Sequence, residues 1–162
     1  MIKQPFKASA IGNIFIVLGP MFIGMLAAVV IPMLNANVNK AKLQEATDTL
    51  DAIKYEVADY VSDVGASTGN LNEAEILTIL GVQVPLSTGM AGGRKWTYRI
   101  VDATGGGGTY NVRATGGAAG DIGSVLACQW VEVRGTYNAA NGVFTSWDWF
   151  SSAGIRASWL PK

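Results

Sequence analysis

The strongest constraint on this chain is a charge-free, apolar stretch near its N-terminus. Residues 14–34 read IFIVLGPMFIGMLAAVVIPML, and no charged residue lies between Lys7 and Lys40. At a rise of 1.5 Å per residue, a helix of about 20 such residues crosses a hydrocarbon layer about 30 Å thick. No other segment of the chain has this length and composition. We therefore expect a helix that lies in a membrane or in equally apolar, water-free packing.

Three interpretations of this helix compete. In a secretory signal peptide, Lys3 and Lys7 would form the basic start, but an apolar run of only 7–15 residues and a small-residue cleavage site should follow. The run here is longer, and residues 35–40 offer a poor cleavage site. The second interpretation is a plain membrane anchor. The third is that the helix is itself an assembly element.

The sequence after the apolar stretch favours the third interpretation. Apolar or small residues continue at spacings of three and four, which places them on one face of a helix. They are Leu43, Ala46, Leu50, Ile53, Val57, Tyr60 and Val64. Charged residues between them, Glu56 and Asp59 included, form a solvated face. We expect one helix of about 50 residues, apolar in its first half, amphipathic in its second, and ended by Gly65.

Proline and glycine interrupt the apolar half. Pro20 and Pro32 each remove a helical N–H, while Gly19 and Gly24 allow a neighbouring helix to approach closely. These residues fit either a kinked anchor or a helix that bends or locally melts when it packs among copies of itself.

The segment GMLAAVVIP (residues 24–32), followed by a polar amphipathic helix, resembles the type IV pilins and the related pseudopilins. The resemblance covers about the first 60 residues. Members of this family carry a short basic leader that ends in glycine, and a glutamate in the first turn of the mature helix. Registered on Pro32, the leader here is residues 1–10, the junction is Ala10–Ile11, and Phe15 stands at the position of the glutamate. Gly12–Asn13 is an alternative junction.

The resemblance implies a structural subunit of an extracellular helical filament that assembles through its apolar helix. The residues it assigns to this helix are Phe15, Gly19, Pro20, Gly24, Leu26, Ala27, Ala28, Val29, Ile31 and Pro32. It implies copies of the same chain, the pilus assembly machinery and, before assembly, the inner membrane as partners. The N-terminus would be cytoplasmic in the membrane, and the assembled filament would lie on the cell surface.

Two alternative functions remain open at the level of the sequence. One is a minor pseudopilin of a type II secretion or DNA-uptake system, which would use the same fold in low copy number. The other is a single-span membrane-anchored binding domain, in which the apolar helix only tethers the rest of the chain.

Composition narrows the possible chemistry. The chain has no histidine, which removes the commonest general base and metal ligand, and its 12 basic residues balance its 12 acidic ones. We therefore predict no enzyme activity, no cofactor, no metal and no nucleic-acid partner. The single cysteine, Cys128, excludes an intrachain disulfide, and its apolar neighbours predict a buried side chain.

The remainder of the chain predicts an antiparallel β domain. Asn72 and Glu75 suggest a capping box for a helix over residues 73–80 with Gly81 as its stop, within a loop region over residues 65–95. Residues 96–162 then change to a period of two. The expected strands cover residues 96–101, 110–114, 125–133 and 143–150, with Asn141-Gly142 as a turn.

The predicted fold is α+β, with the long helix packed on a four-stranded antiparallel sheet so that Leu50, Ile53 and Val57 are buried. Its domain organisation is a leader-like segment at residues 1–10, an apolar helix at 11–34 and an amphipathic continuation at 35–64, followed by the loop region and the β domain. The glycine clusters at residues 105–108 and 116–120 are read as flexible surface loops, because neither has the context of a phosphate-binding motif. Trp147 and Trp149 fall on one strand face and predict core packing or a subunit contact.

Overall fold

A computed structural model describes residues 9–65, 67–85, 88–102 and 108–162, with side chains described from Pro20 onward. The chain divides into two compact units, residues 1–38 and 39–162, which we describe separately. We call the second unit the headpiece. Residues 1–8 of the expected leader and most of the glycine cluster at 105–108 lie outside the described residues.

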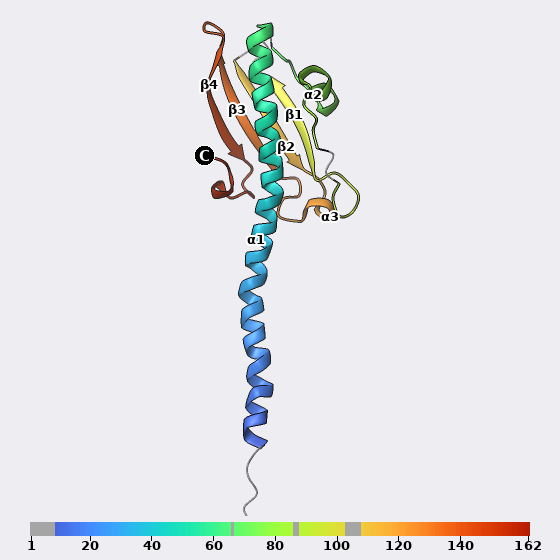
Figure 1. The fold of residues 1–162 in the computed structure, drawn as a ribbon, viewed down its shortest axis with the longest axis vertical. Coiled ribbons are helices and arrows are strands. Elements are labelled where there is room, and N and C mark those ends of the chain that lie inside the picture. The colour runs from blue at the N-terminus through green and yellow to red at the C-terminus, as the bar shows by residue number, and fades with distance from the viewer. Residues whose placement is uncertain (1–8, 66, 86–87, 103–107) are drawn as a thin grey trace, which may run out of the picture. The chain divides into compact units, whose positions relative to one another are not determined.

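The fold is α+β, as the sequence predicts (Figure 1). The helices are α1 (Ser9–Val64), α2 (Glu73–Leu80), α3 (Ala119–Ile122) and a short 3-10 turn, η1 (Ala157–Trp159). The strands are β1 (Trp96–Asp102), β2 (Thr109–Gly116), β3 (Trp130–Asn138) and β4 (Val143–Ser151). The helix α1 contributes to both units, because residues 9–38 belong to the first and residues 39–64 to the headpiece.

Four strands form an antiparallel meander in the order β1-β2-β3-β4. The predicted turn joins β3 to β4, where the N–H of Gly142 donates to the carbonyl of Asn138 at 2.9 Å and Gly142 has a φ of 66°. On the outer side of β1, the backbone of Leu71 exchanges two hydrogen bonds with Ile100. The short bridge at Leu71 therefore covers part of an edge that would otherwise be open to pairing.

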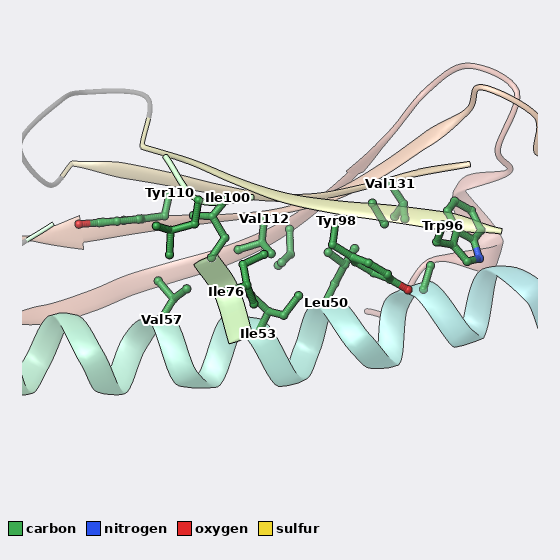
Figure 2. Packing of buried hydrophobic residues seen from close by; sticks show 14 of the residues in the cluster. Leu50, Ile53, Val57, Ile76, Trp96, Tyr98, Ile100, Tyr110, Val112 and Val131 are labelled. Atoms are coloured by element: carbon green, nitrogen blue, oxygen red, sulfur yellow. The ribbon is translucent and has the colours of Figure 1, made fainter. Parts of the chain in front are cut away.

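The core of the headpiece is the layer between the second half of α1 and one face of the sheet (Figure 2). Leu50, Ile53 and Val57 point from the helix into this layer and are fully buried, as predicted. Tyr98, Ile100, Val112 and Val131 meet them from the sheet. The Trp96 indole N–H also donates to the carbonyl of Lys42 at 3.1 Å, which fixes β1 on the helix. Trp147 and Trp149 are partly buried against the same core.

The helix boundaries follow from local chemistry. Gly65 ends α1 with a φ of 65°, a left-handed conformation that glycine adopts without a steric penalty. At α2, the Asn72 side chain accepts from the N–H of Ala74 at 3.0 Å, and the Glu75 carboxylate accepts from the N–H of Asn72 at 2.7 Å. This is the predicted capping box, and Gly81 ends the helix as predicted, with a φ of 70°.

Four sequence predictions in the headpiece are wrong. The third strand begins at Trp130 rather than at residue 125, because residues 124–128 form consecutive turns. Cys128 lies in those turns with a φ of 57°, and its side chain is exposed rather than buried. In the last turns of α1, Val61 is buried and Val64 is exposed. The buried face continues from Val57 to Val61, the residue four positions later on the same side of the helix.

The fourth wrong prediction is the flexible loop at residues 116–120. Gly116 is a buried residue that ends β2, and α3 begins three residues later. A Cβ on Gly116 would overlap the carbonyl of Leu126, and one on Gly117 would overlap the carbonyl of Arg94. These two glycines therefore allow close backbone contacts rather than flexibility.

Candidate assembly interface

We define the apolar segment as residues 20–38 of α1, the part of the first unit whose side chains the structure describes. It contains no charged residue, and its large apolar side chains are exposed. Phe22, Leu26, Val29 and Met33 each expose between 61% and 64% of their surface. The helix that contains this segment is long and apolar enough to cross a membrane. Exposed apolar surface of this extent on one helix indicates membrane association or a further partner.

The apolar segment has two different faces. Phe22, Leu26, Val29 and Met33 follow spacings of four, three and four, so that they form one ridge of bulky side chains along the helix. The opposite face carries Gly24 and Ala28, one turn apart, with Pro20, Ala27 and Ile31 beside them. Apart from Gly24, its two chain neighbours and the adjacent backbone of the same helix, no described atom lies within 4 Å of the position that a Cβ on Gly24 would occupy. The helix surface is therefore open at Gly24 to the backbone or side chains of a neighbour.

Both prolines lie inside the helix. The α-helical backbone runs from Ser9 to Val64 without a break at Pro20 or Pro32. Proline has no N–H, so Pro32 leaves the carbonyl of Ala28 without its usual intrahelical donor. In a membrane or a helix bundle, such a carbonyl is satisfied by a neighbouring helix or by local adjustment of the backbone.

The structure places all the predicted assembly residues on α1. The exposed ones, among those with described side chains, are Pro20, Gly24, Leu26, Ala28, Val29, Ile31 and Pro32, whereas Ala27 is half-buried. Phe15, Gly19 and the junction residues Ala10 and Ile11 belong to the helical backbone, but their side chains lie outside the described residues. Of the predicted residues with described side chains, Leu26 and Val29 lie on the bulky ridge. The small face carries Pro20, Gly24, Ala27, Ala28 and Ile31.

The headpiece buries an apolar core of its own. Its buried apolar residues come from the three α-helices, from β1, β2 and β3 and from the segments between elements, and the partly buried Phe144, Trp147 and Trp149 of β4 pack against them. The apolar segment therefore differs from the headpiece in its exposure. It is the part of the described chain in which long runs of large apolar side chains lack partners.

The outer face of the sheet, away from α1, carries a charged cluster that the sequence did not predict. Glu132 of β3 is fully buried and accepts hydrogen bonds from Arg113 Nε at 2.8 Å and Arg134 Nη2 at 2.9 Å. The Arg113 guanidinium lies 4.6 Å from the centre of the Trp130 ring, and that of Arg134 lies 4.4 Å from the Phe150 ring. The alternation of side chains along β3 predicts that Glu132 lies on the outer face of the sheet. Its burial is not predictable in this way, because it depends on side chains from three strands.

Two buried tyrosines of the headpiece have raised pKa values. Burial, aided by the nearby carboxylates Glu45 and Glu73 and opposed by a hydrogen bond with Thr49 and by the charge of Arg94, raises the pKa of the Tyr98 hydroxyl to about 12. Burial also raises the pKa of Tyr110. Within the described residues, no group of three or more histidine, cysteine, aspartate or glutamate side chains is placed to hold a metal ion.

Comparisons of this chain with protein-family models, with curated proteins and with solved structures found no match. The function is therefore inferred from the residues and their geometry.

Proposed function

We propose that this chain is a structural subunit of a type IV pilus-like filament and that it polymerises through the apolar segment of α1. In this proposal the apolar helices of many copies bundle together, and the headpieces surround the bundle. Before assembly, the same helix anchors the chain in a membrane, with the N-terminus on the cytoplasmic side.

The main observation that supports the proposal is the exposure of the apolar segment, because the headpiece buries an apolar core of its own. A lipid bilayer alone would cover this surface. The small residues Gly24 and Ala28, one turn apart on one face, add a feature that an anchor does not need, because small residues allow helices to pack closely within lipid.

The two faces of the apolar segment also suit open polymerisation. A bulky ridge that packs on the small face of the next copy makes a contact between two different surfaces. Contacts of this heterologous kind repeat without closing unless their rotation generates a ring. The resemblance of residues 24–32 to the pilins supports the same assembly mode.

The decisive experiment is to replace Gly24 with leucine in the full chain expressed in its native membrane. Leucine keeps the segment apolar, so the protein should still insert, but its side chain occupies the open position at Gly24. We expect filaments in sheared surface material, counted by electron microscopy, to fall by at least about tenfold. Membrane-inserted protein, measured by fractionation, should stay unchanged.

The matched control is Met25→Leu, which exchanges two apolar side chains of similar volume at the next position of the same helix. This variant should form filaments at the level of the unmodified chain. Filaments that survive Gly24→Leu would refute close packing at this face. Extraction of the unmodified chain only as monomers or closed dimers would refute the filament itself.

The two alternative functions give different results in this experiment. A minor pseudopilin would be scarce in sheared surface material even without a substitution. A membrane-anchored binding domain would yield no filaments, and the Gly24→Leu variant would keep its binding activity.

A further inference from the structure

The headpiece presents an exposed methionine at the tip of a rigid turn. The N–H of Gly89 donates to the carbonyl of Gly93 at 2.7 Å, and the N–H of Gly92 donates to the carbonyl of Gly89 at 3.1 Å. Met90 lies at the tip of this turn and exposes 93% of its surface. An apolar side chain that is held in water by a well-defined turn contributes nothing to the core of its own chain.

The turn is fixed on α3. The Asp121 carboxylate of α3 accepts a hydrogen bond from the N–H of Gly93 at 2.8 Å. Gly89 packs so closely on Asp121 that a Cβ at this position would overlap it. Asp121 is buried, so its charge is used within the headpiece rather than presented to solvent. The position of Met90 is therefore set by the contacts of its turn with Asp121.

The same part of the headpiece includes the start of its helix. Lys42 Nζ donates to the carbonyl of Ile122 in α3 at 2.7 Å, which connects α3 to the first turns of the headpiece part of α1. Figure 1 shows α3 and the turn before β1 together at this end of the sheet, opposite the β3–β4 turn. We call this end the base surface and define it by Lys40, Lys42, Met90, Ala91, Ala119 and Val125.

The base surface combines apolar and basic groups. Met90, Ala91, Ala119 and Val125 are exposed, and so is Lys40. The carboxylate nearest along the helix, Glu45, forms an ion pair with Lys95 at 3.4 Å. Lys42 is half-buried and bound to the carbonyl of Ile122, so that Lys40 supplies the exposed positive charge. Exposed apolar side chains together with an exposed lysine suit the interface of a membrane with anionic headgroups.

Chain connectivity places the first residues of the headpiece close to the membrane. Asn39, the first residue of the headpiece, follows directly on the apolar segment, whose last large apolar residues are Met33, Leu34 and Val38. When residues 14–34 span the bilayer, residues 35–40 lie at its interface. Lys40, a residue of the base surface, then lies within a few residues of the lipid headgroups.

We propose that, before assembly, the base surface of the headpiece rests on the membrane, with Met90 in the interface and Lys40 against anionic lipid headgroups. This proposal rests on the membrane-anchored state in the proposed function and not on the filament. It gives the unassembled subunit a docked state that anionic lipid stabilises and that salt weakens.

The test measures immersion of a spin label beside Met90. The full chain with Cys128→Ala and Ala91→Cys carries a nitroxide and is reconstituted, with an excess of unlabelled chain, in phosphatidylcholine vesicles with or without phosphatidylglycerol. Electron paramagnetic resonance then compares collisions of the label with oxygen, which is enriched in lipid, and with a water-soluble nickel complex. We expect oxygen collisions to dominate with phosphatidylglycerol and to decrease with added salt.

Two substitutions and two controls make this result specific. Met90→Gln and Lys40→Gln should each lower the ratio of immersed to hydrated label about fivefold. Arg99→Gln removes one positive charge from the outer face of the sheet and should leave the ratio unchanged. A label at Ala139, an exposed residue in the β3–β4 turn, should stay in water.

Two outcomes would overturn the proposal. One is a label at residue 91 that is as hydrated as the label at residue 139 in both lipids. The other is dipolar broadening that grows with the fraction of labelled chain, because it would identify a second copy as the occupant. The filaments of the unmodified chain are counted in a separate experiment. If filaments form but the label at residue 91 is hydrated, only membrane docking is refuted. If the label is immersed but no filaments form, only the proposed function is refuted.

Discussion

Cys128 shows how a single backbone conformation decides the environment of a side chain. Its φ of 57° places it in the left-handed region, and it is the only non-glycine residue of the described chain with a positive φ. The N–H of Cys128 donates to the carbonyl of Gly116 at 3.2 Å, which holds the turn against the end of β2. The side chain points to solvent, although Leu126, two residues earlier, is fully buried.

We expect Cys128→Gly to stabilise the headpiece by about 0.5–1 kcal/mol. Glycine removes the steric cost of the left-handed conformation, and this gain exceeds the extra entropy of glycine in the unfolded chain. Urea unfolding, followed by the fluorescence of the five tryptophans, measures the change, since all of them lie in the headpiece. Cys128→Ala is the matched control because it keeps the Cβ. Equal stability of the two variants would show that backbone strain is absent.

At the scale of elements, the outer face of the sheet is held by charge rather than by apolar packing. Glu132 of β3 binds Arg113 of β2 and the neighbouring Arg134, while aromatic rings from β3 and β4 cover the guanidinium groups. A buried carboxylate is costly to desolvate unless its partners are well placed. This cluster therefore stabilises the pairing of β2, β3 and β4 only while all its members are present.

Glu132→Gln should lower the free energy of unfolding by about 2–3 kcal/mol. The substitution keeps the shape of the side chain but leaves two adjacent guanidinium groups without their counter-charge. Asp148→Asn is the control, because Asp148 is exposed on the same face and its loss should cost at most about 0.5 kcal/mol. Urea unfolding of the two variants under the same conditions compares them. A Glu132→Gln variant as stable as Asp148→Asn would mean that the buried carboxylate contributes nothing to the sheet.

The elements that the sequence predicts are those with local signals. The capping box of Asn72 and Glu75, the stops at Gly65 and Gly81, and the alternation in β1, β2 and β4 are all confirmed. Helix α3 has four residues, which are too few to show a helical period. Residues 125–128 are apolar, and apolar residues occur both in strands and in turns like the observed ones, so their composition does not distinguish the two. The burial of Glu132 and the close contact at Gly116 depend on partners from distant segments, so no local pattern encodes them.

The candidate surfaces also differ in how far the sequence predicts them. The length and apolarity of the helix were predictable from its uninterrupted charge-free run, and its continuation into the headpiece was predictable from the spacing of apolar residues. The base surface was not, because Met90 and Lys40 are 50 residues apart in the sequence. Only the contacts of α3 with both the turn at Gly89 and the helix at Lys42 bring them to one end of the headpiece.

At the scale of the whole molecule, the buried tyrosines predict how stability depends on pH. Tyr98 keeps its proton in the folded chain up to a pKa of about 12, whereas in the unfolded chain it ionises near 10. Above pH 10 the unfolded state therefore binds fewer protons than the folded state, and the free energy of unfolding falls as pH rises. Its contribution, on the order of 2–3 kcal/mol, is fully present below pH 10 and is lost between pH 10 and about 12.

Urea unfolding of the full chain in detergent between pH 8 and pH 12 measures this effect. We expect the midpoint to be flat up to about pH 10 and to fall steeply above it, with a shallower fall in Tyr98→Phe. Tyr110 contributes in the same direction, so some alkaline sensitivity remains in that variant. Tyr55→Phe, at an exposed position, should match the unmodified chain. A Tyr98→Phe variant with the same slope as the unmodified chain would assign the alkaline transition to other groups.

The exposed position of Cys128 has a chemical consequence for any polymer of this chain. One accessible thiol per chain limits covalent cross-linking to a single disulfide, so an oxidising environment can join chains only in pairs. No continuous covalent network can grow from it, and a reductant should leave the length of a filament unchanged.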